Sequence, residues 1–426
     1  MRRAFSKAVL VAALSTTMMV PVSGAMAEAV KIRFMDRTTA TEQAAYSKWL
    51  ADTFNAAHEG EIEIVWEGVP DEAYKTKIFT VLRAPNPPDV FYSWEGGRAK
   101  FLIDSGFAAE LDPYYEKYGW KDIMNPSGVQ LATFDGHQYF VPTMMAAAVL
   151  WYRPDILKEL GLEAPSTWAD AMAAADTLKQ AGITPFILAN QMRWPAQFMW
   201  SALFVNTYGV EAYDDLIARR LAWTDPKVVD AFQIMKDLMD GGYFENGANG
   251  IDITPAVVPF SKGEAAMWYQ GSFMTGRFLD DAGAPKFPLD YTTFPSVGDQ
   301  APTVSVFAEN TLMMLAQSEH KDEAAEFLDW VLSVESQTRQ SNEGKLLFPA
   351  NVNVSLDNFD PLMQRLGKTI AAPQDATFMH VDHAVPDALA DPFLDGLQSV
   401  LVGVMSPEQA AAQVENAAQA ELGDVN

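Results

Sequence analysis

The chain contains no cysteine among its 426 residues. Disulfide bonds, thiolate metal sites and a cysteine nucleophile are therefore excluded. Histidine is also scarce, and the five histidines show no spacing typical of a metal site. The nearest pair is His380 and His383, which we expect at the protein surface. We therefore predict no metal ligands and no cofactor.

Motifs of catalysis are missing as well. The sequence has no G-x-S-x-G, no H-E-x-x-H and no glycine-rich phosphate loop. A glycosidase needs two carboxylates at a set separation across one bond, and no local motif pairs the acidic residues here. We predict that the protein is not an enzyme and has no catalytic residues. A secreted glycosidase is the less favoured alternative.

Positively charged residues are few compared with acidic residues. Lys and Arg together number 30 against 56 Asp and Glu, which gives a formal net charge of −26. Such a charge favours solubility and opposes binding to nucleic acid or to an anionic membrane. We therefore expect no nucleic-acid partner.

Residues 1–27 have the pattern of a secretory signal peptide. Arg2, Arg3 and Lys7 precede a short apolar run, and an A-x-A cleavage site ends at Ala27. The run is too short to span a bilayer. The paired arginines leave both the general and the twin-arginine export routes open. Because no cysteine follows for a lipid anchor, we predict a soluble protein of the Gram-negative periplasm.

The first part of the chain alternates strands with helices. Strands are predicted at 30–35, 62–66 and 89–94, with helices at 42–55 and 74–82. This alternation is typical of parallel βαβ units, in which ligands bind beyond the carboxyl ends of the strands. The candidates at such ends are Asp36, Arg37, Trp94, Glu95 and Arg98.

Later strand ends also combine aromatic rings with amides and carboxylates. Residues 265–269 form a compact apolar run, which is followed by a turn at Gly271. Such groups can hold the faces and the hydroxyls of a small polar ligand. The further candidates are Asn190, Gln191, Trp194, Trp268, Gln270, Gly271, Ser272, Glu309 and Asn310.

Several short motifs occur in a characteristic order. They include Pro88-Asp89-Val90, the segment 106–111, Pro165-Ser166-Thr167-Trp168, and Phe-x-x-Gly-x-Ala-Ala-Met at 260–267. In this order and spacing the sequence resembles the extracellular solute-binding proteins of sugar ABC importers, the maltose-binding-protein-like group. The resemblance covers nearly all of the chain after the signal.

The resemblance implies an α/β, two-lobed periplasmic binding protein fold with discontinuous lobes joined by a multi-strand hinge. The N-terminal lobe would comprise 28–143 and 310–347, and the C-terminal lobe 144–309 and 348–426. Ligand would bind in the cleft between the lobes, which close over it by a hinge motion. Trp94 matches a ligand position of the family, and Trp268 would face it across the cleft.

The implied function is that of a monomeric periplasmic protein that captures a sugar, such as an oligosaccharide or glucoside, and delivers it to an ABC permease. Two other ligands stay open for the same fold. Arg37 and Arg98 could bind a glycerol phosphodiester. Trp94, Glu95 and Glu309 could bind a polyamine.

Overall fold

The computed structural model describes residues 28–38, 41–280, 282–298, 302–342, 348–372, 377–423 and 425. The predicted signal peptide lies outside these residues. Within the described ranges, no helix combines the length and the apolar character that a membrane span would require.

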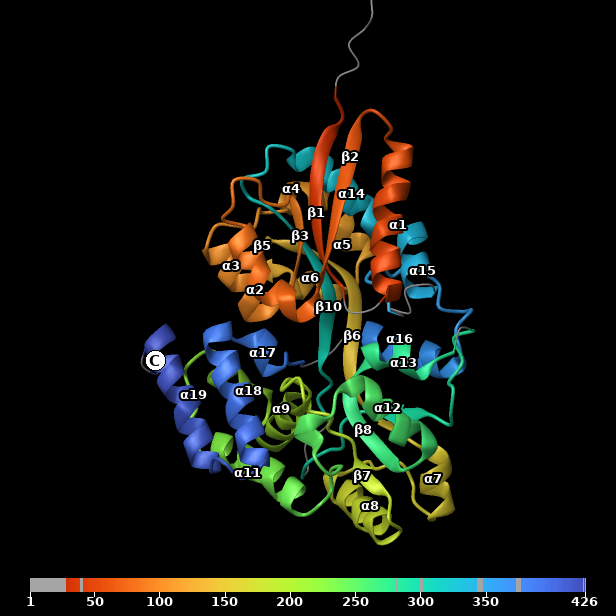
Figure 1. The fold of residues 1–426 in the computed structure, drawn as a ribbon, viewed down its shortest axis with the longest axis vertical. Helices are drawn as coiled ribbons and strands as arrows, with labels where there is room; N and C mark the ends of the chain where they lie inside the picture. The colour runs from red at the N-terminus through yellow and green to blue at the C-terminus, as the bar shows by residue number, and fades with distance from the viewer. Residues whose placement is uncertain are drawn as a thin grey trace, which may run out of the picture.

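The molecule consists of two lobes stacked along its long axis (Figure 1). Eight strands form one sheet that runs through both lobes, in the order β2-β1-β3-β10-β6-β8-β7, with β9 paired to β6. The strands β1, β2 and β3 are parallel, as the βαβ pattern predicts, whereas β10 is antiparallel to β3 and to β6. The strands are β1 (Val30–Thr38), β2 (Ile62–Pro70), β3 (Val90–Ser93), β6 (Phe140–Tyr152), β7 (Thr184–Phe186), β8 (Ala265–Gly271), β9 (Asp290–Thr292) and β10 (Val306–Met314).

Helices cover both faces of this sheet. Around the upper lobe they are α1 (Thr41–Ala57), α2 (Asp71–Val81), α3 (Gly96–Asp104), α4 (Asp112–Tyr118), α5 (Trp120–Ile123), α6 (Pro126–Leu131), α14 (Lys321–Leu332) and α15 (Val334–Asn342). Around the lower lobe they are α7 (Pro154–Glu159), α8 (Trp168–Gln180), α9 (Pro195–Tyr208), α10 (Val210–Ile217), α11 (Pro226–Asp240), α12 (Ile253–Lys262), α13 (Thr275–Phe278), α16 (Pro361–Ala371), α17 (Val381–Ala384), α18 (Asp387–Leu401) and α19 (Pro407–Leu422).

Local sequence features determine where several helices and strands begin or end. Thr167 begins α8 in a capping box with Asp170. Asp135 and Gly136 both have positive φ and form the tight turn between β4 (Thr133–Phe134) and β5 (His137–Gln138). Residues 321–342 form two helices, α14 and α15, because Ser333 between them is extended and its hydroxyl accepts from the backbone N–H of Ser336.

The buried apolar residues form separate cores in the two lobes. The upper core joins residues from β1, α1 and β3 to residues from β10 and α14, so its members are far apart in the sequence. The lower lobe has one core on each face of its part of the sheet. Every residue of β6 from Phe140 to Trp151 is buried, as expected for a strand covered on both faces.

Among the described residues, three chain segments lie across the junction of the lobes. The strands β6 and β10 are antiparallel neighbours that extend from the upper into the lower lobe (Figure 1), and β10 has a bulge at Ala308–Asn310. The third segment lies beside β6, where Met145 donates its backbone N–H to the carbonyl of Phe348 over 2.9 Å. The boundaries 143/144, 309/310 and 347/348 stay predictions.

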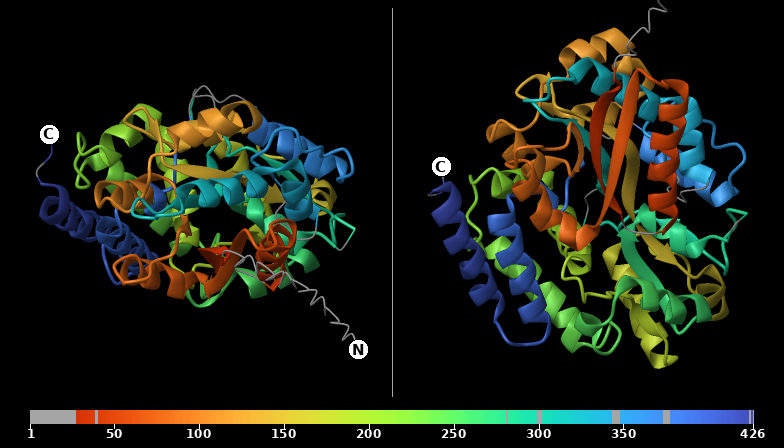
Figure 2. Two further views of the ribbon diagram at one scale, coloured as in Figure 1. Left: turned by 90° about the horizontal axis from the view of Figure 1, so that it is seen from above. Right: turned by 45° about the horizontal axis from the view of Figure 1, so that its top comes forward.

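A buried ion pair holds the C-terminal helix to the lower lobe. Figure 2 shows α18 and α19 side by side on the flank of that lobe. On α19, the Glu415 carboxylate accepts two hydrogen bonds from Arg219, of 2.8 and 2.9 Å, and a third from the backbone N–H of Trp223. Removing one partner would leave an unpaired buried charge.

We therefore expect Arg219→Ala to lower the free energy of unfolding by about 3–5 kcal/mol. Arg220→Ala is the matched control, because Arg220 pairs with Asp215 in an exposed ion pair and its loss should cost less than about 1 kcal/mol. Urea denaturation of both variants measures the difference. Equal losses would contradict the assignment of Glu415 as a buried anchor.

Candidate ligand-binding site between the two lobes

The turn from β3 to α3 presents polar groups to the lower lobe. β3 ends at Ser93, and Glu95 precedes the first residue of α3, Gly96, which has a φ of 69°. The turn therefore lies at the carboxyl end of a parallel strand, as predicted. Glu95 is fully buried, and Trp94 and Arg98 are also buried.

Trp94 is packed by groups of its own lobe. Its ring lies edge-to-face with Tyr92, at a centroid distance of 4.8 Å, and with Tyr74, at 6.0 Å. The Arg98 guanidinium lies over the Trp94 ring at 4.7 Å, a favourable cation–π geometry. A cavity of about 10 Å³ beside these residues, which Asp387 of the lower lobe also lines, has room for about one water.

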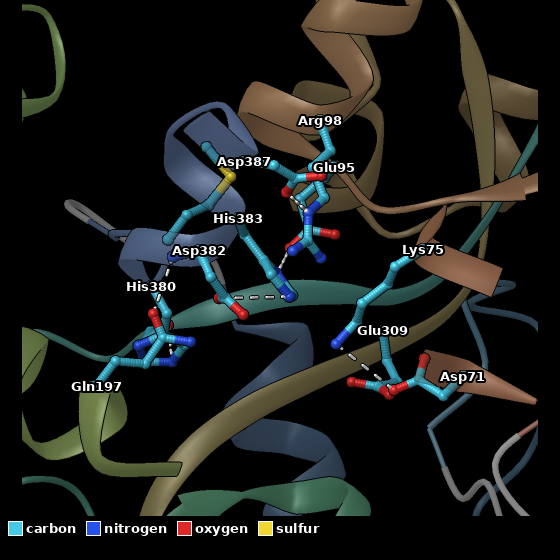
Figure 3. A network of polar contacts seen from close by, with 12 residues as sticks. Asp71, Lys75, Glu95, Arg98, Gln197, Glu309, His380, Asp382, His383 and Asp387 are labelled. Carbon is cyan, nitrogen blue, oxygen red and sulfur yellow. Dashed lines mark hydrogen bonds and ion pairs between the residues drawn. The ribbon is translucent and has the colours of Figure 1, made fainter. Parts of the chain in front are cut away.

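Two polar contacts join this turn to α17 and α18 of the lower lobe (Figure 3). His383 Nδ1 lies 2.9 Å from Glu95 Oε1, and Arg98 Nε donates to Asp387 Oδ1 over 2.6 Å. His383 donates to this carboxylate oxygen in the tautomer that carries the hydrogen on Nδ1. The lobes are therefore in direct contact in this structure.

The two histidines near α17 are not at the surface, so that expectation was wrong. His380 is 1 % exposed, and burial lowers its pKa to about 3, which keeps it neutral. The side chain of His383 is 14 % exposed. Burial lowers the pKa of His383, but the carboxylates of Glu95 and Asp382 outweigh burial, so the net shift of this pKa is upward.

A second polar group lies nearer to the strands that join the lobes. Arg37, at the end of β1, donates to Asn310 Oδ1 over 2.7 Å and to Glu309 Oε1 over 3.1 Å. Arg37 also donates to Asp71 at the start of α2, over 3.3 Å. Burial raises the pKa of Glu309 although the Arg37 charge acts in the opposite direction. The structure thus brings three of the predicted residues together around one guanidinium.

Asp36 points into the upper lobe. Its carboxylate accepts from the Ser47 hydroxyl over 2.5 Å, and burial raises its pKa to about 6. It lines a cavity of about 20 Å³, again the size of about one water, together with side chains that include Thr143 and Asn310.

The predicted residues at the exit of β7 are divided between the interior and the surface. Asn190 is fully buried; its amide donates to Asn249 Oδ1 over 2.9 Å and accepts from the N–H of Ala196 over 3.0 Å. Gln191 is exposed. Trp194 is half-buried and packs against Phe198 and Phe273. Asn190 therefore shapes the loop before α9, and its side-chain contacts are internal.

Trp268 does not face Trp94, which corrects the expectation for the lower wall of the cleft. Its ring is 0 % exposed and packs against Phe260 and Phe278 in the lower core. The physical reason is that both faces of β8 are covered, so a ring on either face enters a core. We therefore leave Trp268 out of the candidate site.

The residues after Trp268 hold the end of β8. Gln270 accepts the N–H of Gly271 over 2.9 Å, and the Ser272 hydroxyl accepts the N–H of Ala147 over 3.2 Å. A Cβ on Gly271 would lie 2.2 Å from the Phe273 ring, so the turn requires glycine unless this ring moves. Gln270 and Gly271 contact each other, whereas Ser272 contacts Ala147 of β6, 125 positions away in the sequence.

Four buried polar atoms near the contact between the lobes make no hydrogen bond within the described part of the chain. They are Glu95 Oε2, Gln197 Nε2, His380 Nδ1 and Asp382 Oδ1. Gln197 connects to the same group, because its Oε1 accepts the backbone N–H of Asp382 over 2.8 Å (Figure 3). Buried polar atoms are normally paired, so this mixture of a donor and acceptors can bind a polar molecule.

Sequence analysis did not identify Gln197, Asp382 or His383 as candidate site residues. The one available signal for Gln197 was a lone amide in the otherwise apolar start of α9. His383 meets Glu95 across 288 positions of sequence, a contact that local pattern cannot reveal.

Comparison with known proteins adds a family and a fold. The model of the bacterial extracellular solute-binding protein family matches residues 38–338. An uncharacterised ABC transporter extracellular-binding protein of Pyrococcus horikoshii is 27% identical over 355 residues, which cover 82% of this chain and 78% of that protein. A protein of Rhizobium meliloti named a probable sugar-binding periplasmic protein is 26% identical over 325 residues, 74% of this chain and 76% of that one.

Solved structures with the same architecture include a chitin oligosaccharide binding protein. Its TM-score is 0.82 at 23% sequence identity, and the match covers 91% of this chain and 98% of that chain. A structure from work on xylan utilisation by Caldanaerobius polysaccharolyticus also has a TM-score of 0.82, at 24% identity, with 91% and 99% covered. At these identities the likeness establishes the two-lobed fold.

The raised pKa of Asp36 predicts how stability depends on pH. Because the folded-state pKa of about 6 exceeds the ordinary 3.8, the stability due to the protonated form is fully present below about pH 4 and is lost as pH rises through 6. At about pH 7.5, Asp36→Asn should therefore raise the free energy of unfolding by on the order of 1–3 kcal/mol. The gain should shrink at about pH 4.

Chemical denaturation at the two pH values tests this difference. Asp52→Asn is the control, because Asp52 lies on the exposed side of α1 and forms an exposed ion pair with Lys48. If Asp36→Asn is less stable than the parent at about pH 7.5, the ionised form of Asp36 contributes more than its burial costs, and the expectation fails.

Proposed function

Because this chain belongs to the family of bacterial extracellular solute-binding proteins, we propose that it captures a carbohydrate between its lobes and delivers it to the permease of an ABC importer. The ligand is an oligosaccharide or a glucoside. The names of the sugar-binding relative from Rhizobium meliloti and of the chitin oligosaccharide binding protein support this ligand class.

The observation that carries the proposal is the group of buried polar atoms where the lobes meet that make no hydrogen bond within the described residues. Glu95 Oε2 and Asp382 Oδ1 can accept hydrogen bonds, and Gln197 Nε2 can donate them. Each sugar hydroxyl both donates and accepts, so one carbohydrate could satisfy all three atoms. Trp94 adds an aromatic ring beside these groups.

Ligand entry requires the lobes to part. The two cavities beside the candidate residues measure about 10 and 20 Å³, whereas a sugar needs a site of hundreds of Å³. The contacts Glu95–His383 and Arg98–Asp387 would break as the lobes separate. The paired strands β6 and β10 would bend between the lobes, in a hinge motion of the kind common in binding proteins.

The proposed site is a subset of the predicted residues together with groups from the lower lobe. From the upper lobe and the connecting strands it takes Arg37, Trp94, Glu95, Arg98, Glu309 and Asn310. From the lower lobe it takes Gln197, Asp382 and His383. The proposal further includes the lobe boundaries given above, a monomeric state, no enzymatic activity, and export to a Gram-negative periplasm without a lipid anchor.

A polyamine is the second candidate ligand. The unpaired oxygens of Glu95 and Asp382 would also accept from ammonium groups. A glycerol phosphodiester is less well supported, because carboxylates already engage both arginines that would bind it. Arg37 pairs with Asp71 and Glu309, and Arg98 pairs with Asp387.

Thermal unfolding with trial ligands tests the proposal. We expect a chito-, xylo- or malto-oligosaccharide to raise the melting temperature of the purified protein, because a ligand that binds only the folded state stabilises it. Stabilisation by spermidine without a response to any saccharide would replace the carbohydrate with a polyamine.

For the saccharide that binds, Glu95→Gln should weaken affinity roughly 10- to 100-fold, the value of a hydrogen bond to a charged group. Titration calorimetry measures the loss. Glu110→Gln is the control, because Glu110 is an exposed residue of the same lobe, and its affinity should equal that of the parent. An unchanged affinity in Glu95→Gln would remove Glu95 from the site.

A further inference from the structure

Two Asn-Gly pairs lie close together between α11 and α12 of the lower lobe. They are Asn246-Gly247 and Asn249-Gly250, and the sequence contains no other Asn-Gly pair. Asparagine is chemically labile, and in such a pair the backbone nitrogen of the glycine can attack the asparagine side chain. Glycine favours this attack because it has no Cβ to obstruct the approach. The structure places the two asparagines in different environments, so the two pairs should react at different rates.

The first pair is open to reaction. Asn246 is exposed, and its side chain makes no hydrogen bond within the described residues. Gly247 is also exposed and has a φ of 75°. Among the same residues its backbone N–H has no hydrogen-bond partner. The attacking nitrogen and the amide that it attacks can therefore both reorient in contact with water.

The second pair is held in place by three hydrogen bonds. Asn249 Oδ1 accepts from Asn190 Nδ2, and Asn249 Nδ2 donates to the backbone oxygen of Gln398, both over 2.9 Å. The N–H of Gly250, which would have to attack, donates to the carbonyl of Gly247 over 2.7 Å. A Cβ built on either glycine would meet nothing within 4 Å. The two pairs therefore differ in their hydrogen bonds and not in the space around the glycine.

We propose that Asn246 is a site of spontaneous deamidation in this protein. Asn249 is protected from the same reaction, because its hydrogen bonds to Asn190 and Gln398 hold its side chain in place. A group held in this way reacts only in the small fraction of molecules in which the local contacts are open. The inference goes beyond solute binding and does not depend on which ligand the protein binds.

The reaction needs no reactant other than water. The backbone nitrogen of Gly247 forms a bond to Asn246 Cγ, and the bond from Cγ to Nδ2 breaks. The leaving NH2 group takes up the proton that the Gly247 nitrogen gives up and departs as ammonia. The product is a cyclic imide. Water then adds to one of the two imide carbonyl carbons and opens the ring, which leaves aspartate or isoaspartate at position 246.

The modified position adjoins a residue that supports the exit of β7. The carboxylate of Glu245 accepts the backbone N–H groups of Leu188 and Ala189, over 2.9 and 2.6 Å. Ala189 has a positive φ of 51°, a conformation that needs support from its surroundings. Deamidation of Asn246 places a second negative charge beside the carboxylate that gives this support, and isoaspartate also adds a methylene group to the main chain.

Mass spectrometry of the purified protein, incubated at physiological temperature and mildly alkaline pH, tests the proposal. Tandem spectra of its peptides locate each residue at which OH has replaced NH2. Digestion in water enriched in heavy oxygen marks any deamidation that takes place during the digest, so that this fraction can be subtracted.

We expect product at position 246 to accumulate at least about tenfold faster than at position 249, because three hydrogen bonds must open before Asn249 can react. The product at position 246 should contain both aspartate and isoaspartate. Equal rates at the two positions, a faster reaction at position 249, or an Asn246 that stays intact would overturn the proposal.

A variant tests the cause of the protection. Asn190→Ala removes the donor to Asn249 Oδ1, so it should raise the rate at position 249 about 3- to 10-fold, the value of one hydrogen bond, and leave the rate at position 246 unchanged. Asn358→Ala is the matched control, because Asn358 is exposed and makes no hydrogen bond within the described residues. Both of its rates should equal those of the parent.

Thermal unfolding shows whether Asn190→Ala is folded. A folded Asn190→Ala variant with the parental rate at position 249 would overturn the protective role of Asn190. If this variant does not fold, the comparison of positions 246 and 249 in the parent protein still decides whether Asn246 is the reactive residue.

Discussion

The antiparallel pair of β6 and β10 is the constraint on which the rest of the molecule depends. Both strands run through the part of the sheet that lies in each lobe. Each strand therefore contributes buried residues to the cores of both lobes. This requirement explains why β6 is an unbroken buried run instead of an alternating one. The bulge at Ala308–Asn310 interrupts the ladder between the lobes and turns Glu309 toward Arg37. The position of the candidate site near these strands thus follows from the sheet.

Several residues of the proposed site are candidates that sequence pattern names at strand ends. Glu95 and Arg98 follow β3, and Arg37 is buried near the end of β1, so the parallel arrangement of these strands brings the three residues to one edge of the sheet. Pattern failed for Trp268, since an apolar run with a terminal tryptophan looks the same whether one or both faces of the strand are covered. Only the packing of Phe260 and Phe278 around the ring decides between these cases.

The lower-lobe half of the site was beyond sequence reasoning for a different reason. Two helices that are distant in the chain carry Gln197, Asp382 and His383. Tertiary contacts, and not local sequence, bring these polar side chains to the proposed site. Likewise position 97 requires glycine because the backbone of Val385 in the opposite lobe lies close to it. Such requirements arise from contacts between the lobes. The periodicity of apolar residues in a segment indicates only how that segment packs within its own lobe.

The interleaved course of the chain also bears on how the protein is made. The upper core packs residues of β1 and α1 against residues of β10 and α14, which are synthesised more than 240 residues later. The first strands to leave the ribosome therefore cannot complete their core until most of the lower lobe has been translated. Non-local pairing of this kind slows folding, because a long loop must close before its contacts form. The upper lobe of this chain can therefore reach its native packing only once nearly the whole sequence is available.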